Sequence, residues 1–170
     1  MQIETKRLII RRLTVADAPE LFRTFGDPDV MKYWLGGSDK SIGATEQRIV
    51  EIEDHWKTHD FGDWGVVEKK NGRLIGFSGL HYIADMAEVN IGYAFEKSKW
   101  RQGFGFEACQ AILDFGFQEL GLPVIVAVIW PENIASIKLA EKLGLCFWKA
   151  FIWQGEERVA YMFRDENVQM

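Results

Sequence analysis

Two glycines one residue apart stand in the stretch Trp100-Arg101-Gln102-Gly103-Phe104-Gly105-Phe106-Glu107-Ala108. Apolar residues then recur at helical spacing up to Gly121, so the glycines open a long helix. Glycine lets a ligand approach the backbone closely, and the amides of a first helical turn have no partner inside the helix. With the helix dipole, this arrangement favours a phosphate or pyrophosphate. A helix entry that needs glycine only for its turn geometry is the alternative.

The surroundings of these glycines limit what the loop holds. Lys97, Lys99 and Arg101 add positive charge before the helix. The spacing also fits G-x-G-x-x-A, but a dinucleotide site needs a strand running directly into the first glycine. Here seven mostly polar residues, 96–102, intervene after the strand that ends at Phe95. The sequence therefore argues against a nicotinamide or flavin site.

Upstream, the pattern predicts a strand at Arg7–Leu13 and three helices. The first helix follows a cap at Thr14 or Asp17 and ends at Gly26-Asp27-Pro28; the others span about Val30–Trp34 and Thr45–Thr58. Three antiparallel strands follow, predicted at Trp64–Glu68, Leu74–Leu80 and Glu88–Phe95.

Two positions in this meander carry sharper predictions. Asn71-Gly72 predicts a type I′ hairpin turn, which requires a positive φ at both residues. Gly92, inside the third strand, predicts either a bulge or a close approach of another group to the backbone.

Downstream, the continuous apolar run Val124–Trp130 predicts a strand buried on both faces. A helix at about Asn133–Leu143 and a final hairpin, Leu145–Trp153 with Arg158–Phe163, complete the order. The pattern predicts a mixed α/β domain built on one sheet. We expect residues 1–170 to form that single domain, because no linker or repeat interrupts them.

Composition excludes several classes of protein. The 170 residues carry a net charge of −5 and give a pI near 5.3, the wrong sign for a generic nucleic-acid binder. No apolar run is long enough to span a bilayer, and no apolar segment follows the charges at the start of the chain, so we expect no membrane partner, no signal peptide and a cytoplasmic protein. Two cysteines, Cys109 and Cys146, form no disulfide framework.

The sequence resembles the GNAT superfamily of acyl-coenzyme A-dependent N-acyltransferases, and within it the ribosomal-protein N-terminal acetyltransferases. The superfamily loop is Gln/Arg-x-x-Gly-x-Gly/Ala; this chain departs only at the first position, where Trp100 stands. The resemblance covers nearly the whole chain and is carried by Thr5–Arg11, Asp27–Trp34, Gly72–Phe77, Ile91–Tyr93, Gln102–Phe106 and Glu132–Ser136.

The resemblance implies that acetyl-coenzyme A is the cosubstrate and lies between two splayed parallel strands of a mostly antiparallel sheet flanked by helices. Backbone groups of Ala94 and Phe95 would contact its pantetheine and thioester. The amides of Gln102, Gly103, Phe104, Gly105 and Phe106 would hold the pyrophosphate, and Asn133 and Lys138 complete the expected cofactor set.

Direct transfer to an amine needs a base, a donor at the oxyanion and an acid at the leaving sulfur. By resemblance, Ser136 is placed near the sulfur, although a serine in a first helical turn also bonds its own backbone. Glu88 is the leading base candidate, with a solvated edge carboxylate as its alternative; His81 is a second candidate base and Tyr161 a second candidate acid. Tyr33 and Trp34 are expected to line the acceptor pocket.

The resemblance predicts an N-acetyltransferase acting on the primary amine of a protein N-terminus or a small molecule. The alternative is a non-catalytic module that binds acyl-coenzyme A as a sensor or scaffold. No metal is expected, since His55 and His59 have zinc-like spacing but no third ligand nearby. The aromatic-rich last hairpin leaves a homodimer open.

Overall fold

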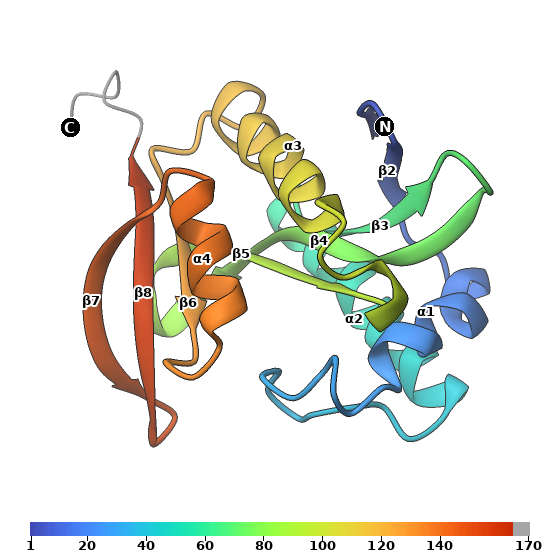
Figure 1. The fold of residues 1–170 in the computed structure, drawn as a ribbon, viewed down its shortest axis with the longest axis horizontal. Coiled ribbons are helices and arrows are strands. Elements are labelled where there is room, and N and C mark those ends of the chain that lie inside the picture. Colours follow the sequence, from blue (N-terminus) through green and yellow to red (C-terminus); the bar gives the residue numbers. More distant parts are fainter. Residues whose placement is uncertain (165–170) are drawn as a thin grey trace.

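The computed structural model describes residues 1–164 and contains one eight-stranded sheet in the order β1-β2-β3-β4-β5-β6-β8-β7 (Figure 1). The strands are β1 (Gln2–Glu4), β2 (Leu8–Arg12), β3 (Asp63–Glu68), β4 (Arg73–Ile83), β5 (Glu88–Phe95), β6 (Val124–Ile129), β7 (Cys146–Trp153) and β8 (Glu156–Arg164). The helices are α1 (Ala18–Phe25), α2 (Ile42–His59), α3 (Phe104–Gln118) and α4 (Ile134–Lys142). The predicted mixed α/β fold is confirmed.

The helices cover both faces of the sheet, and alternation along the strands divides the core into two. On one face, Phe25 of α1 and Ile49 of α2 pack with Leu74 and Phe77 of β4. On the other, the apolar stripe of α3 packs with Ile75 and Leu80 of β4; Leu74 and Phe77 share the first face because the ladder shifts by one residue at Ile75. We call these the α2 face and the α3 face. Successive strand residues point to opposite faces, so each β5 residue serves one face only.

Three local expectations are corrected by the structure. Val30–Trp34 is a series of turns rather than a helix, because Gly36 and Gly37 with φ of 80° and 66° follow directly and leave no length for a second turn of helix. A short strand, β1, pairs with β2 and was missed. The helix predicted at Thr45–Thr58 begins earlier, at Ile42, because the Ser41 hydroxyl caps it by accepting from the Ala44 amide.

The turn at Asn71-Gly72 also differs from a type I′ hairpin. Glu68 pairs with Arg73, so the loop has four residues, 69–72. Only Gly72 has a positive φ, of 68°, and its amide donates to the Glu68 carbonyl at 2.9 Å. The two-residue turn with positive φ at both positions occurs instead at Gln154 and Gly155, in the final hairpin, which is confirmed.

Gly92 marks a close approach rather than a bulge. The ladder runs without a shift through the pair Gly79–Gly92, whereas the irregularity in this part of the sheet falls between Val66 and Val67 of β3. A Cβ atom at Gly92 would lie 3.0 Å from a ring carbon of Trp34 and 3.1 Å from the His81 ring. The absent side chain is therefore what admits these two rings to β5.

Candidate active site

The sheet opens between β5 and β6. Among residues 1–164 these two neighbours are the only parallel pair of strands, and they share a single paired position, Asn90 with Val126. Two residues further along β6, the Val128 amide donates to the side-chain Oδ1 of Asn90 at 2.8 Å, instead of to the main chain of β5. From this point the strands part, and we call the opening the seam.

The β4–β5 register decides which β5 peptide groups face the seam. The Glu96 amide donates to the Ile75 carbonyl. Because hydrogen-bonded pairs alternate along an antiparallel ladder, the main chain of Ala94 hydrogen-bonds with its partner Phe77 of β4. The Tyr93 peptide groups and the Phe95 amide therefore point the other way, toward β6, while the Phe95 carbonyl accepts from the Trp100 indole at 2.8 Å. The register thus directs the backbone groups of Ala94, which were expected to contact a ligand, toward β4, and those of its neighbour Tyr93 toward the seam.

The glycine loop ends at the amino terminus of α3. Gly103 is the N-cap residue with a φ of 80°, a left-handed conformation that glycine adopts without strain. No side chain within residues 1–164 caps the first turn, so the amides of Phe104, Gly105 and Phe106 face outward. A Cβ atom at Gly105 would sit 3.4 Å from Leu139, which shows how closely α4 approaches this turn.

The side chains of the loop are occupied elsewhere. The Phe104 ring is buried in the core of the α3 face. The Gln102 amide group donates to the Ser98 carbonyl at 2.6 Å. Both residues can therefore meet a ligand through their main chain only.

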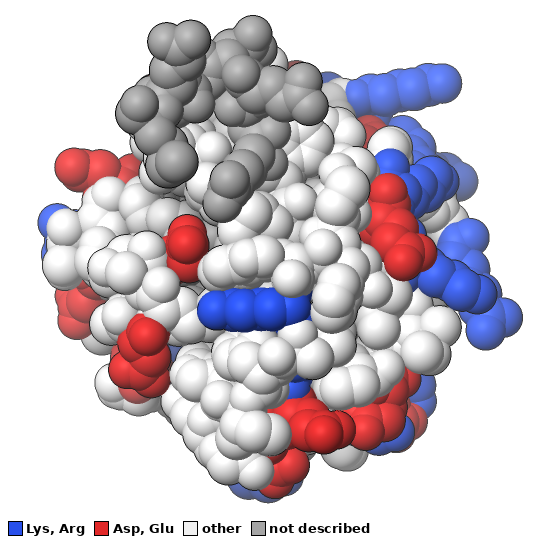
Figure 2. All heavy atoms as spheres, turned by 90° about the vertical axis from the view of Figure 1, so that its left-hand side faces the viewer, with Lys and Arg blue, Asp and Glu red and all other residues white. Residues whose placement is uncertain are grey.

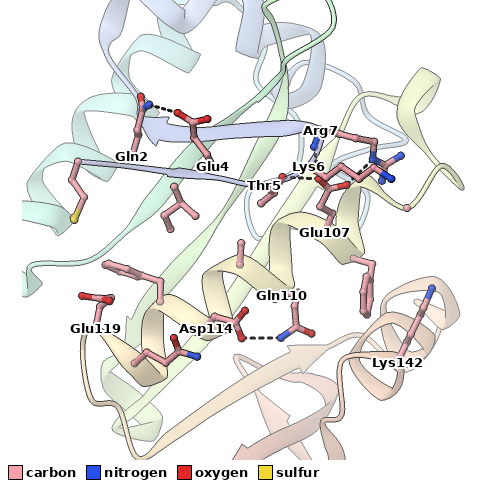
Figure 3. Close-up of a pocket in the computed structure, with 17 residues that line it drawn as sticks. Gln2, Glu4, Thr5, Lys6, Arg7, Glu107, Gln110, Asp114, Glu119 and Lys142 are labelled. Atoms are coloured by element: carbon pink, nitrogen blue, oxygen red, sulfur yellow. Dashed lines mark hydrogen bonds and ion pairs between the residues drawn. The ribbon is translucent and has the colours of Figure 1, made fainter.

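A salt bridge ties this loop to the start of the chain (Figure 3). Glu107 accepts from the Thr5 hydroxyl at 2.6 Å, from the Arg7 amide at 2.7 Å and from Arg7 Nε at 2.6 Å. Arg7 also donates to the Gln102 carbonyl and stacks on the Phe104 ring at 4.3 Å. Burial pushes the Glu107 pKa up, but the hydrogen bonds from Thr5 and Arg7 outweigh it and lower that pKa. The carboxylate thus stays ionised and holds the loop in place.

A cavity of about 920 Å³ lies beside the Arg7–Glu107 salt bridge, between residues 1–7 and the outer side of α3. It reaches the loop at Gly103 and Phe106 and extends to Lys142 of α4 (Figure 3). The Lys142 ammonium is 4.6 Å from the centroid of the Phe106 ring.

Of the three cations expected near the loop, two are paired. Lys97 forms an ion pair with Asp29, and Lys99 lies 2.5 Å from a carboxylate oxygen of Glu68. Arg101 has no carboxylate partner within the described part of the chain and is exposed. The free positive charge near the loop therefore comes from Arg101 together with Lys138 and Lys142, which are exposed on α4.

Asn133 and Ser136 open α4 on the α3 face. The Asn133 side chain caps the helix by accepting from the Ser136 amide at 3.2 Å. The Tyr93 phenol of β5 reaches across and donates to Ser136 Oγ at 2.8 Å. Burial raises the pKa of Tyr93, so its phenol is protonated at neutral pH. Sequence reasoning missed Tyr93, whose position on the α3 face follows only from the strand register.

Tyr33 and Trp34 lie on the other side of β5, in the turns after α1. The Tyr33 carbonyl accepts from the Trp130 indole at 2.8 Å, which ties this loop to the end of β6. The Trp34 ring packs edge-on against Phe77 at 5.1 Å and against His81 at 6.2 Å. The structure thus brings both residues to the α2 face near the seam, although no helix carries them.

A second cavity, of about 240 Å³, opens on this α2 face between β3, β4 and α2. Its lining includes Trp34, His81 and Asp63, together with Glu51 and His55 of α2. His81 Nδ1 lies 3.2 Å from Asp63 Oδ1. Burial alone would lower the His81 pKa, but the nearby negative charge of Asp63 raises it. Asp63 was not singled out from the sequence, because its partner is 18 residues away.

The remaining candidates lie apart from these groups. Glu88 begins β5 opposite Ile83, five residues before Tyr93, which is about 17 Å along a strand. Tyr161 is buried in the core and packs edge-on against Phe147 at 5.8 Å. Cys109 is buried, which raises its thiol pKa to about 12.

No helix within residues 1–164 combines the length and the apolar character needed to cross a bilayer. No group of three or more His, Cys, Asp or Glu side chains there is arranged to hold a metal ion.

Comparison with known proteins identifies the family. The model of the acetyltransferase (GNAT) domain family matches residues 7–145. The chain is 32% identical over 143 residues to YoaA, an uncharacterised N-acetyltransferase of Bacillus subtilis (strain 168), with 84% of this chain and 81% of that protein covered.

Solved structures share the fold. A GNAT-family acetyltransferase of Bacillus anthracis superposes with a TM-score of 0.84 at 26% identity, covering 96% of this chain and 98% of that one. RimL, a ribosomal L7/L12 alpha-N-protein acetyltransferase solved with coenzyme A, has a TM-score of 0.82 at 14% identity, covering 96% and 98%. The chain belongs to the GNAT acetyltransferase family and is an N-acetyltransferase.

Proposed function

We propose that this protein transfers an acetyl group from acetyl-coenzyme A directly to a primary amine. The observation that carries the proposal is the seam: β5 and β6 part at Asn90, and the uncapped first turn of α3 lies at the same end of the sheet. An elongated thioester with a diphosphate fits such a slot, because the helix amides favour the anion.

The expected cofactor residues have distinct parts in this proposal. The amides of residues 102–106 would hold the diphosphate, and the glycines at 103 and 105 keep side chains away from it. The Tyr93 peptide groups and the Phe95 amide would contact the pantetheine arm, as the register of β5 directs. Asn133 would act indirectly by fixing the start of α4, and exposed Lys138 and Lys142 offer charge for the outer phosphate of coenzyme A.

Ser136 is the proposed acid at the leaving sulfur. A serine hydroxyl both accepts and donates, and here the accepting side is taken by the Tyr93 phenol. The Ser136 proton is therefore free to hydrogen-bond a thiolate. Acetyl-coenzyme A, when bound, supplies the activated acetyl group as a thioester; the chain's own part is to position it and to manage the protons.

The proposed acceptor is a primary amine of a peptide N-terminus or a small molecule, entering from the α2 face. The carboxylates of Glu51 and Asp63 line the cavity there, while Arg48 is neutralised by Asp39 at 2.6 Å. This balance favours an ammonium group. Tyr33 and Trp34 would form the wall of the entrance. The name of RimL, which describes action on a protein α-amine, supports the peptide alternative.

Two measurements test the proposal. Calorimetry should show acetyl-coenzyme A binding with a micromolar Kd. Release of free coenzyme A should then be followed with an alanine-initiated peptide, a serine-initiated peptide, spermidine, lysine and kanamycin, and the product identified by mass spectrometry. No binding at millimolar acetyl-coenzyme A would refute the site. Binding without release for any amine would favour the sensor or scaffold alternative.

A homodimer through β7 is the proposed assembly. β7 is an edge strand, and Phe147, Trp148 and Ile152 on it are exposed. Figure 2 shows this side of the molecule as a broad surface with few charged side chains. An edge strand can pair antiparallel with its own copy across a two-fold axis. Light scattering should report a dimer that Ile152→Glu converts to a monomer; a monomeric wild type at 100 μM would refute it.

A further inference from the structure

His81 of β4 and Asp63 of β3 form an isolated acid–imidazole pair at the wall of the α2-face cavity. The His81 side chain is 27% exposed, whereas that of Asp63 is 10% exposed. Asp63 Oδ1 is buried and lies 3.2 Å from His81 Nδ1, within ion-pair distance, and it accepts no hydrogen bond within residues 1–164. The negative charge beside Nδ1 favours the proton on that nitrogen and leaves Nε2 as the basic nitrogen.

The Nε2 atom of His81 faces β5. Nε2 and Cε1 of His81 lie 3.1 Å from the position that a Cβ atom of Gly92 would occupy. Gly92 precedes Tyr93, whose phenol reaches Ser136 on the opposite face. The imidazole beside Gly92 and the serine bonded to Tyr93 thus lie on opposite faces of the sheet, at adjacent positions of β5.

His55, in the same cavity, cannot take this part. Its Nδ1 lies 2.8 Å from the Phe61 carbonyl, and its Nε2 accepts from the Tyr82 amide at 3.2 Å. Both nitrogens are occupied, and burial lowers the His55 pKa. Glu88 lies on the same face as His81 but about 13 Å farther along β5 from Gly92. Among the residues of the described chain that line this cavity, His81 alone presents a basic nitrogen without a hydrogen-bond partner, and that nitrogen faces Gly92 of β5.

We infer that His81 is the general base of the transfer and that Asp63 is its positioning residue. This inference rests on the proposed function. Neutral Nε2 takes one proton from the entering ammonium and later passes it to solvent through the open cavity. The freed amine nitrogen then forms the C–N bond as the C–S bond breaks. The second proton leaves that nitrogen as the amide forms, and it balances the proton that the departing thiolate takes up.

Charges facing the ring set the pH dependence. Asp63 of β3 lies closest to the ring. Helix α2 contributes Glu51, uncharged His55 and Arg48, whose charge is paired with Asp39. The turns after α1 contribute only the neutral Trp34. The pKa of His81 is raised above its usual 6.5, with Asp63 as the cause of the rise. Activity should therefore fall as pH drops through a value above 6.5, because the ring becomes protonated. Removing the Asp63 charge should move that fall to lower pH.

The experiment measures kcat and KM against pH with the amine from the coenzyme A-release panel that reacts fastest. His81→Gln should lower kcat about 100-fold at pH 7.5 and leave the KM for acetyl-coenzyme A within about twofold. Asp63→Asn should shift the acidic limb of kcat/KM downward by about one pH unit. His59→Gln is the matched control. His59 is the last residue of α2 and does not line the cavity, so this variant should match the wild type.

A titration by NMR with histidine ring labels gives a readout independent of turnover. The His81 signal should titrate above 6.5 in the wild type and lower in Asp63→Asn. An unshifted titration, or a wild-type pH profile and kcat in His81→Gln, overturns the inference while leaving the acetyltransferase intact. Loss of the acidic limb in Glu88→Gln instead transfers the base to Glu88. No coenzyme A release from the wild type with any amine refutes the proposed function itself. Should His81→Gln fail to fold, the Asp63→Asn shift decides.

Discussion

The Tyr93 phenol and the Ser136 hydroxyl join β5 to α4 through a 2.8 Å hydrogen bond in which the tyrosine donates. Burial raises the Tyr93 pKa, so this donor persists across the neutral range. The direction of the bond matters, because it leaves the serine proton without a partner in the pair. The cap of α4 is supplied by Asn133, so the Ser136 hydroxyl is not needed for it.

Ser136→Ala should lower kcat by roughly 100-fold while leaving the Kd for acetyl-coenzyme A nearly unchanged, since the hydroxyl acts on the leaving sulfur and not on binding. Steady-state coenzyme A release and calorimetry measure the two quantities. Ser136→Thr keeps a hydroxyl at the same place and should recover most of the rate. Equal rates in Ser136→Ala and the wild type would remove Ser136 from the mechanism.

Tyr93→Phe should give a smaller loss of kcat than Ser136→Ala, because the serine remains but is no longer oriented. The double variant with Ser136→Ala should be no slower than Ser136→Ala alone, since both changes interrupt one pair. The three rate constants, measured at one pH, form the test. A fully additive double variant would show that Tyr93 acts through something other than Ser136.

Gly105→Val should weaken acetyl-coenzyme A binding at least tenfold. A Cβ atom here already meets Leu139 at 3.4 Å, so the branched side chain has to turn outward over the first-turn amides. Gly105→Ala is the matched control: its single methyl makes an ordinary contact and should change the Kd less than threefold. A folded valine variant with wild-type affinity would show that the loop does not hold the diphosphate.

Glu107→Gln should lower the free energy of unfolding at pH 7 by about 1 kcal/mol, because charged hydrogen bonds from Thr5 and Arg7 weaken. The Glu107 pKa is lowered in the fold, so this stabilisation is present above about 4.5 and is lost as pH falls through the lowered value. Urea denaturation at pH 7 and pH 3 measures it, with exposed Glu46→Gln as the control. A difference that persists at pH 3 would contradict the ionic origin.

The sequence predicted the elements whose signals are local. Periodic apolar residues identified α3, and the unbroken run at Val124–Trp130 identified β6. The segment Val30–Trp34 was mistaken for a helix because it is rich in apolar residues, of which Val30 and Met31 are buried. Its backbone forms turns, which the apolar pattern does not distinguish from a short helix. The hairpin at Asn71-Gly72 has the expected residues, but the strand register made a four-residue loop of it.

The site divides in the same way. The glycine loop and the start of α4 are continuous in sequence and were found from it. Tyr93, Asn90 and Asp63 act through partners 43, 38 and 18 residues away, so only the register of the sheet brings them to their places. Once a strand at Glu88–Phe95 is predicted, alternation alone places Gly92 and Tyr93 on opposite faces of the sheet. The sequence does not show which helix covers each face, so it could not predict what these two residues contact.

The Asn90 side chain makes the slot between β5 and β6 a preorganised feature. Where the strands part, the Val128 amide would lose its main-chain partner on β5. The Asn90 Oδ1 accepts from this amide instead, so the amide is already hydrogen-bonded. Closing the sheet there would require that bond to break, so the open form is the resting form. Little binding energy is then consumed in separating the strands, and more of it is left to restrain the ligand.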